Sequence, residues 1–511
     1  MITTSCTSMT SQIKIRKLNH ASLKIDSDMD IAMELSEAFT FMVDGAKFSP
    51  AFKMGQWDGF IRLFNLGSRT IASGLYQKVI EFAEQRSYTW EVVDDSKTTG
   101  YEPPSYTTPD IDTASVSAYM DSLRLHARGE SLNIRDYQIE GVRVALLNRQ
   151  AILQSSVGSG KSMMLYCIIR YITEVLKMRV LLVVPTVGLT TQMQSDFKDY
   201  SSHNGYDVEA NLHLITAGVT KDTDKLVVVS TFQSLREVTP DWINSYGAII
   251  TDEGHKITAK SFQDIYGKAT KVPFRLTCTG TLHELKCNIL TMVGLTGSVY
   301  EIALTKNLIS AGQLVPLNIK AISLNYDTDT CKLAKNLDYE EELMWLVTAP
   351  KRNNFISKMA VSCKGTTLVF FRFLVQGQAL YDLIKAMVGD TREVYLIDGD
   401  MEKEERERVR LLTANTDPIL VVSYGTMSAG VNMPTVANMI IAHPIKSKIT
   451  FLQSIGRGLR LQEGKTHCNL FDIGDNLAHK AKVNTTYRHF GDRLQLLTGE
   501  GYEFKMVNVP F

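Results

Sequence analysis

The 511-residue sequence predicts an α/β fold in which two tandem doubly wound parallel-sheet domains follow a small α+β N-terminal module. Three observations lead to this prediction. The chain is too long for one hydrophobic core, since domains average about 150 residues. Short runs rich in Val and Ile recur without polar alternation, as in parallel strands buried on both faces. Helical segments such as 161–177 separate these runs, which is the order of β-α-β units.

Residues 96–115 mark the clearest break in the chain, because they are rich in Pro, Gly, Ser and Thr and lack apolar periodicity. We expect an N-terminal module over residues 1–95, a linker over 96–116, a first α/β domain over 117–309, and a second with a C-terminal tail over 310–511. The expected strand cores are AILQSS, VLLVVPT, LVVVST, AIITDE and FRLTCTGT in the first domain, and TTLVFFRF, EVYLIDG, PILVVSY, MIIAH and CNLFDI in the second.

Composition narrows the class of protein. The chain is 44% hydrophobic and 22% charged, and no apolar run is long enough to span a bilayer. The first 17 residues lack the apolar core of a signal peptide, so we expect a cytoplasmic protein with no membrane partner. Seven cysteines form no Cys-x-x-Cys pair, which favours reduced thiols over a zinc site or a disulfide framework. Lys plus Arg and Asp plus Glu number 55 each, so net charge neither indicates nor excludes a nucleic-acid partner.

The first strand of the first α/β domain leads into SSVGSGKS, residues 155–162. Its two glycines permit a tight loop whose N–H groups, together with the N-terminus of the next helix, can surround a phosphate chain. We expect Lys161 to reach the β- and γ-phosphates of ATP, and Ser162 to bind Mg²⁺. Ser155 stands where the strict pattern has glycine, but the phosphate-binding residues are present. The loop residues expected to bind ATP are Ser156, Val157, Gly158, Ser159 and Gly160.

A second strand runs directly into Asp252, Glu253, Gly254 and His255. A polar turn at the surface would explain these four residues alone, but a phosphate-binding loop needs two carboxylates at a neighbouring strand end. Asp252 is expected to bind Mg²⁺ and Glu253 to orient or deprotonate the attacking water. We expect main chain to crowd the phosphate at Gly254, so that a small residue is needed there. His255 lies too far along the turn to share the work of Glu253, and is expected to respond to closure of the domain cleft. Together the two motifs predict an ATPase.

The second α/β domain offers cations in QSIGRGLR, where Arg457 and Arg460 are three residues apart and therefore neighbours on one helical face. Hydrolysis at a phosphate-binding loop usually needs a cation from elsewhere to stabilise charge on the transferring group. A solvated pair on the surface is the alternative. Gln453 and Gly456, which precede the arginines, favour a position in a cleft.

Eight motifs over roughly residues 130–475 resemble, in order and spacing, those of superfamily 2 helicases and translocases. The motifs are RDYQ, SSVGSGKS, VPTVGLTTQ, TDEGH, TGT, TLVFFRF, SYGTMSAGVNMP and QSIGRGLR. The resemblance implies two RecA-like domains that close on ATP. Two departures occur, at Gly254, where Ala or Cys is commoner, and at Asn432, where many relatives have Asp.

The same resemblance implies roles for individual residues. Arg135 and Gln138 would contact the adenine, Gly430 the γ-phosphate side, and Arg457 and Arg460 would be arginine fingers. The residues that would couple ATP to nucleic acid are His255, Thr279, Thr281 and Gln453. The residues that would contact the nucleic-acid backbone are Thr186, Thr231 and Thr426.

The N-terminal module contains KMGQWDG, residues 53–59, in which Asp58-Gly59 predicts a hairpin turn. The aromatic residues around it favour a small core over a base-stacking platform; they are Phe48, Phe52, Trp57, Phe60 and Phe64. The motif also resembles the N-terminal module of UvsW-type phage helicases, so the resemblance extends over essentially the whole chain. It implies a DNA-binding module with Trp57 as a contact. It also implies a DNA recombination helicase that acts on Holliday junctions, forks and R-loops, which contain RNA–DNA hybrids.

Other functions share this motor. Double-strand DNA translocases within restriction enzymes pump DNA without unwinding it, and RNA helicases separate short duplexes. No nuclease motif is present, which argues against a self-contained restriction enzyme. A nucleotide-dependent scaffold would keep the fold but lose Glu253 or the arginines, and all of these are present.

Overall fold

The computed structural model divides into two compact units, one formed by residues 1–155 and 160–302 and the other by 156–159 and 303–511. The N-terminal module therefore belongs to the same unit as the first α/β domain. The second unit begins before the predicted boundary at residue 310. Within the described residues no helix is long and apolar enough to cross a membrane. The structure describes residues 12–43, 45–93, 111–127, 129–216, 218–256, 259–282, 286–399, 401, 405, 408–409, 416–428, 435–459 and 465–511.

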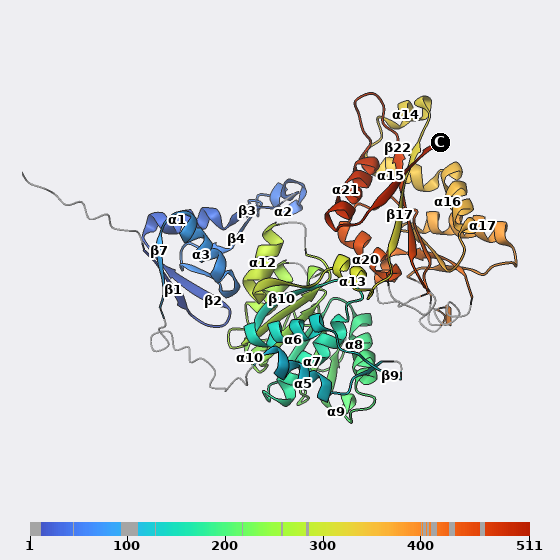
Figure 1. The fold of residues 1–511 in the computed structure, drawn as a ribbon. Helices are drawn as coiled ribbons and strands as arrows, with labels where there is room; N and C mark the ends of the chain where they lie inside the picture. Colours follow the sequence, from blue (N-terminus) through green and yellow to red (C-terminus); the bar gives the residue numbers. More distant parts are fainter. Residues whose placement is uncertain are drawn as a thin grey trace, which may run out of the picture. The chain divides into compact units, whose positions relative to one another are not determined.

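The N-terminal module is a five-stranded sheet in the order β5-β6-β2-β1-β7, with α1 and α3 packed on it (Figure 1). Its strands alternate: Ile13 and Ile15 on β1 are buried, whereas Lys14 and Arg16 beside them are only partly covered. The elements are β1 (Gln12–Lys17), β2 (Ser22–Asp26), α1 (Met29–Ala38), β5 (Phe64–Asn65), β6 (Thr70–Ala72), η2 (Ser73–Leu75), α3 (Tyr76–Gln85) and β7 (Thr89–Val93).

A long connection in the module replaces the expected tight turn at Asp58-Gly59. β3 (Thr40–Met42) pairs antiparallel with β4 (Phe60–Arg62), and the residues between them form η1 (Ala46–Phe48) and α2 (Pro50–Lys53). The prediction of a hairpin turn at Asp58-Gly59 is wrong, because these residues lead directly into β4 at the end of the connection. There the Asp58 carboxylate accepts from the N–H of Phe60 at 3.1 Å and from Arg62 at 2.5 Å.

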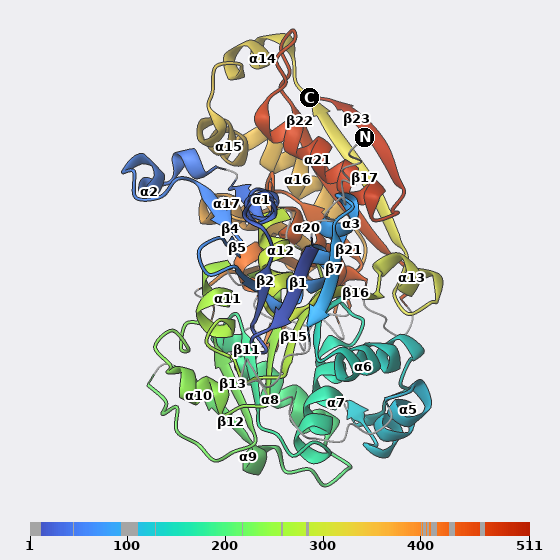
Figure 2. The ribbon, with the colours of Figure 1, turned by 90° about the vertical axis from the view of Figure 1, so that its left-hand side faces the viewer.

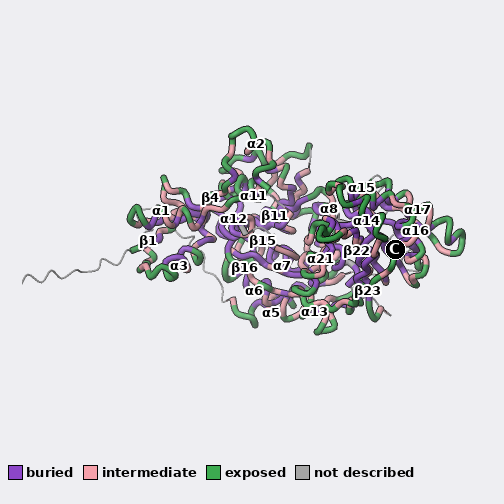
Figure 3. The backbone as a smooth tube through the Cα atoms, turned by 90° about the horizontal axis from the view of Figure 1, so that it is seen from above, coloured by how far each residue is buried: buried purple, intermediate pink, exposed green. Residues whose placement is uncertain are grey.

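The aromatic side chains of this connection do not form one small core. Phe48 is 81% exposed and Phe60 is 37% exposed, whereas Phe64 is 2% exposed and joins the module core. The prediction of a shared core is therefore wrong for Phe48 and Phe60. Trp57 is partly exposed and donates from Nε1 to the Phe60 carbonyl at 3.0 Å. Figure 3 shows the backbone around α2 largely in the colour of exposed residues.

The first α/β domain is built on a seven-stranded sheet in the order β12-β13-β11-β14-β15-β10-β16, with parallel pairing from β12 through β10. All five expected strands are present, and β12 and β16 are additional. Both faces are buried, since on β11 Leu181 and Val183 contact one core while Val180, Leu182 and Val184 contact the other. The strands are β10 (Gln150–Ser155), β11 (Val180–Val184), β12 (Leu212–Ile215), β13 (Val227–Thr231), β14 (Ala248–Asp252), β15 (Phe274–Thr279) and β16 (Ser298–Ala303).

Helices α5 to α8 cover one face of this sheet, and α11 and α12 contribute to the core on the other (Figure 2). α5 begins at Thr113, inside the predicted linker, where Asp112 and Ser115 form a capping box. Residues 96–110 of that linker lie outside the described residues. The helical elements are α5 (Thr113–Ser122), α6 (Asp136–Asn148), α7 (Lys161–Glu174), α8 (Val187–Tyr200), α9 (Val208–Asn211), α10 (Pro240–Asn244), η3 (Gly254–Lys256), α11 (Ala259–Tyr266) and α12 (Lys286–Thr296), and a small β8 (His126–Ala127)–β9 (Glu130–Ser131) pair lies before α6.

The module is packed tightly onto the first α/β domain. A Cβ added to Gly74 would lie 1.9 Å from the Val293 carbonyl on α12, so only glycine permits this approach. The main chain of His20 is held at both ends: its N–H donates to the Thr270 carbonyl at 3.0 Å, and its carbonyl accepts from Gln150 Nε2 at 3.0 Å. Module and domain also share one apolar core.

The second unit contains another seven-stranded sheet, in the order β19-β20-β18-β21-β22-β17-β23, and all six pairs are parallel. The five expected strands are present, and β17 and β23 are additional. Most of the stretch 402–416 lies outside the described residues. The strands are β17 (Leu317–Asn325), β18 (Thr367–Phe371), β19 (Val394–Ile397), β20 (Ile419–Ser423), β21 (Asn438–Ile441), β22 (Cys468–Asn476) and β23 (Phe504–Pro510). The helices are α13 (Thr305–Ser310), α14 (Thr328–Ala334), α15 (Tyr339–Thr348), α16 (Pro350–Ser362), α17 (Leu374–Val388), α19 (Tyr424–Ser428), α20 (Lys448–Gly458) and α21 (Thr485–Gly499).

Candidate functional site

The phosphate-binding loop lies between the end of β10 and the N-terminus of α7, where helix N–H groups are free to bind an anion. Gly158 and Gly160 have φ angles of +85° and +87°, in the region that a Cβ disfavours. A Cβ on Gly160 would also lie 2.5 Å from Nε2 of Gln138. The loop conformation therefore favours glycine at both positions, and Gln138 lies against the loop.

Lys161 and Ser162 open α7 and carry the polar groups expected to serve ATP. Lys161 Nζ donates to the Ser155 carbonyl at 3.0 Å, so the ammonium group lies over the loop. The Ser162 side chain forms a hydrogen bond with Tyr200, whose own pKa is raised by burial. No motif in the sequence pointed to Tyr200, which the end of α8 brings to this place.

Asp252 ends β14 and is 5% exposed. Burial and the neighbouring Glu253 charge raise the pKa of Asp252 to about 7, while Lys161 acts in the opposite direction. Because the raised pKa shows that the positive charge beside this buried carboxylate does not offset its burial, a divalent cation bound here would stabilise the ionised form. Together with the Ser162 hydroxyl it provides hard oxygen donors, which suit Mg²⁺ because that ion takes one or two carboxylates and retains several waters.

Glu253 adopts a left-handed backbone conformation with φ of +50°, which is uncommon for a residue other than glycine. Its N–H donates to Asp252 Oδ1 at 2.9 Å, so the Asp252 carboxylate is held against the main chain of Glu253. Strained backbone of this kind persists only where the surroundings hold it, and it often occurs at catalytic positions.

Gly254 lies against a side chain of the protein itself, which already leaves no room for a Cβ. A Cβ at this position would lie 2.4 Å from Cγ2 of Thr277 on β15, and 3.4 Å from Met292 Sδ and Phe262 Cζ. The crowding of main chain against the phosphate, which the sequence argument gave as the reason for glycine, stays a prediction. Contacts at 3.4 Å are ordinary, so the clash comes from Thr277 alone.

His255 lies closer to Glu253 than the sequence argument allowed. The turn η3 folds the chain back, so that His255 Nδ1 is 3.5 Å from Glu253 Oε2. Nδ1 also contacts Thr279 Oγ1 at 2.6 Å, and that hydroxyl donates to the Thr281 carbonyl at 2.7 Å. Because the hydroxyl proton is used by Thr281, Nδ1 must carry a proton and donate. His255 therefore joins the end of β14 to the end of β15.

Comparison with known proteins covers the whole of this architecture. Residues 12–93 match the family "DNA helicase UvsW, N-terminal", residues 131–284 match "Type III restriction enzyme, res subunit", and residues 351–462 match "Helicase conserved C-terminal domain". The chain is 30% identical to the ATP-dependent DNA helicase UvsW of Enterobacteria phage T4, over 97% of this chain and 99% of that protein. The chain belongs to the UvsW family of ATP-dependent DNA helicases.

Solved structures agree with membership of the UvsW family. The crystal structure of T4 UvsW aligns over 98% of this chain and 99% of its own, with a TM-score of 0.51 and 28% identity. A DNA-bound Type ISP restriction-modification enzyme, LlaBIII, has a TM-score of 0.54 but 16% identity over 32% of its length, and shows the fold alone. Another relative, the DNA 3′-5′ translocase XPB2 of Sulfurisphaera tokodaii, is 24% identical over 67% of this chain and 82% of its own.

The remaining predicted site residues of this UvsW-family helicase are placed as follows. Thr186 is exposed and occupies the N-cap position of α8, where its side chain makes no capping hydrogen bond. Thr231 and Thr426 are buried, and their hydroxyl groups bond Ser234 at 3.0 Å and Ser423 at 2.7 Å. Gln453 and Arg457 lie on α20 of the second unit. Gly430, Asn432 and Arg460 lie outside the described residues.

Proposed function

We propose that this UvsW-family helicase uses ATP to remodel branched DNA, namely Holliday junctions, forks and R-loops with their RNA–DNA hybrids, during recombination and replication. The phosphate-binding loop holds ATP, with Lys161 on the β- and γ-phosphates and Arg135 and Gln138 on the adenine. Mg²⁺, when bound by Ser162 and Asp252, neutralises charge on the phosphates.

Hydrolysis in this proposal depends on residues of both units. Glu253 orients or deprotonates the attacking water. His255, Thr279 and Thr281 form the hydrogen-bonded link by which a change at the Glu253 carboxylate reaches the segment after β15. Arg457 and Arg460 stabilise the charge that develops on the transferring group, and Gln453 acts beside them. Thr186, Thr231 and Thr426 contact the DNA backbone.

The observation that supports branched DNA as substrate is the surface of the β3–β4 connection. Its exposed apolar side chains, Phe48 at 81% and Met54 at 63%, lie in a segment that also holds the exposed Lys47 and Lys53. Aromatic side chains beside cations are the combination that binds unstacked bases and their phosphates. Because the module is packed tightly on the first α/β domain, this surface moves with the domain that binds ATP. It is therefore suited to bind DNA at the branch point, where the strands diverge.

The test compares ATPase stimulation and strand separation on single-stranded, duplex, four-way-junction and RNA–DNA substrates. We expect the wild-type protein to prefer the junction. Phe48→Ala with Met54→Ala should lower junction unwinding roughly 5- to 160-fold, since a stacked base contributes about 1–3 kcal/mol. Single-strand-stimulated ATPase should be unchanged. Leu333→Ala is the matched control, because Leu333 is 82% exposed on α14 of the second unit. Equal preference for duplex and junction in the wild type would refute the proposal.

A translocase that moves on duplex DNA without unwinding it is the second candidate, and the similarity to XPB2 favours it. The same assay separates the two. Duplex-stimulated ATPase without strand separation on any branched substrate would establish translocation in place of unwinding.

A further inference from the structure

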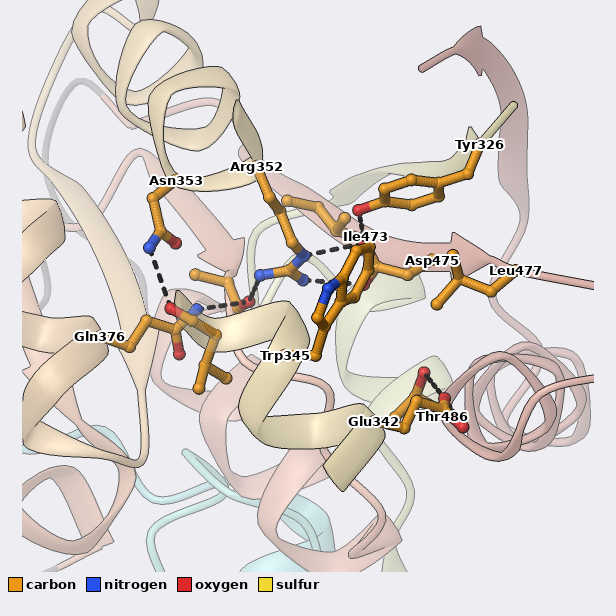
Figure 4. Close-up of polar contacts among 12 residues, drawn as sticks. Tyr326, Glu342, Trp345, Arg352, Asn353, Gln376, Ile473, Asp475, Leu477 and Thr486 are labelled. Carbon is orange, nitrogen blue, oxygen red and sulfur yellow. Dashed lines mark hydrogen bonds and ion pairs between the residues drawn. The ribbon is translucent and has the colours of Figure 1, made fainter. Parts of the chain in front are cut away.

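Two buried arginines of the second unit hold the chain just before α20. The first is Arg352 on α16, which is fully buried. Its Nε and Nη2 donate to the two carboxylate oxygens of Asp475 at 2.8 and 2.9 Å, and its Nη1 donates to the Ala442 carbonyl at 2.8 Å. Figure 4 shows the guanidinium between Asp475 and Gln376, whose Nε2 donates to the same Ala442 carbonyl at 3.2 Å, with Tyr326 on Asp475.

The second buried arginine is Arg493 on α21. Its Nη2 donates to Asp472 Oδ1 at 2.7 Å and its Nε to Asp472 Oδ2 at 3.0 Å, while Nη1 donates to the Ile445 carbonyl at 2.7 Å. The N-terminus of α21 is itself fixed by Glu342 on α15, which accepts from the N–H groups at 485 and 486 and from the Thr486 hydroxyl (Figure 4). A carboxylate at this position suits the positive end of the helix dipole.

The two arginines share one arrangement. Both pair with an aspartate of β22, and each uses its remaining donor on a main-chain carbonyl at one end of the segment 442–445. That segment joins β21 to α20, and Ser447 then caps α20 by accepting from the Thr450 N–H at 3.2 Å. Buried ion pairs contribute little net stability, but they can fix one geometry among several. Here the geometry fixed is the start of the helix that carries Gln453 and Arg457.

We propose that Arg352 and Arg493 are positioning residues for Arg457, which they serve through the segment 442–445. This rests on the proposed function, in which Arg457 stabilises the transferring phosphoryl group. Arg457 follows the first residue of α20 by about 14 Å at 1.5 Å per residue. A tilt of roughly 5° at the start of the helix would therefore move the finger by about 1 Å, a displacement that can cost on the order of 100-fold in rate.

Arg392 provides a matched control in the same unit. It also donates to main-chain carbonyls, namely those of Cys363, Gly365 and Asp417, but these lie at the amino-terminal ends of β18 and β20. The 442–445 segment follows β21 at the opposite, carboxyl end of the sheet. Loss of Arg392 should therefore affect stability without affecting α20.

The experiment uses full-length protein and paired substitutions, Arg352→Met with Asp475→Asn and Arg493→Met with Asp472→Asn. Each pair removes both charges together, so that neither partner remains as an unpaired buried ion. We expect single-strand-stimulated kcat to fall roughly 10- to 100-fold, with KM for ATP within about twofold of wild type. Arg392→Met should lower Tm and keep the stimulated kcat. If a pair fails to fold, Arg493→Lys keeps a cation beside Asp472 without the forked geometry and gives the same readout.

Combination with Arg457→Ala distinguishes positioning from general damage. Residues that act through Arg457 should cause no further loss of kcat once Arg457 is absent. Wild-type stimulated kcat in the folded pairs, or losses that multiply with that of Arg457→Ala, would overturn the proposal. Wild-type turnover in Arg457→Ala alone would instead refute the role given to Arg457 in the proposed function. Arg352 and Arg493 would then have no catalytic residue to position.

Discussion

Replacement of Gly254 by alanine, the residue commoner at this place in superfamily 2, should damage this protein. The new Cβ would lie 2.4 Å from Thr277 Cγ2, about 1.0 Å short of the 3.4 Å at which ordinary contact begins. Thr277 is fully buried on a central strand and cannot move outward. Overpacking of this kind costs about 1–3 kcal/mol, which corresponds to a Tm lower by roughly 3–10 °C.

The backbone shift that relieves this clash should also affect catalysis, because Gly254 directly follows the two carboxylates of the site. A movement of Glu253 by about 1 Å would lower kcat by up to roughly 100-fold. The assay is thermal unfolding together with DNA-stimulated ATPase. Thr277→Ser removes Cγ2 and keeps the hydroxyl, so in the double variant it should restore most of the Tm and of the kcat. Gly254→Ala with wild-type Tm and kcat, or a lack of rescue by Thr277→Ser, would refute this reasoning.

The other predictions concern single groups of the site and the module. Lys161→Ala should abolish ATP turnover with little change in Tm, since its ammonium contacts the loop and not the core; turnover at the wild-type rate would contradict the loop assignment. Glu253→Gln should bind ATP yet turn it over at least about 100-fold more slowly, as equilibrium binding and single-turnover kinetics would show, and failure to bind would make Glu253 structural. Arg457→Ala should bind ATP and lose about 10³-fold of DNA-stimulated turnover, measured as the ratio of rates with and without DNA. Burial and the charges of Lys17, Arg275 and Arg149 lower the pKa of His20 to about 3, below the unfolded value of 6.5. The contribution of neutral His20 to stability is therefore complete above pH 6.5 and is lost as pH falls toward 3. Tm should then fall less steeply below pH 6.5 in His20→Gln than in the wild type, and identical slopes would contradict this.

The strands that sequence predicts best are those buried on both faces. The ten apolar runs identified by composition are all strands, because a continuous Val- and Ile-rich run has few alternatives in a parallel sheet. The four strands of the α/β domains that were missed lack this signal. β17 is internal, but Asn318, Lys320 and Ser323 interrupt its apolar residues. β12, β16 and β23 lie at sheet edges, and the FKMVNVP sequence of β23 keeps its side chains largely in solvent.

Motifs identify the residue types of the site but not its local geometry. Lys161 and Asp252 could be named from spacing, because a phosphate-binding loop and a neighbouring carboxylate occur in that order along the chain. The left-handed conformation of Glu253 and the turn that returns His255 to it depend on packing between β14 and β15. The aromatic residues of the module show the same limit, since pattern cannot tell that Phe48 points into solvent.

The boundary drawn at residue 95 marks a change of composition and not an energetic division. Leu75 and Val79 of the module share a core with Val293 and Leu295 of α12, and the Gly74 contact brings their backbones together. Deletion of residues 1–95 would expose that apolar surface to water, which costs about 25 cal/mol of stability per Å². A loss of junction activity in the deletion variant would therefore not separate loss of DNA contact from unfolding. Substitutions at Phe48 and Met54 in the exposed β3–β4 connection leave this core intact, and they are therefore the ones that can assign DNA binding to the module.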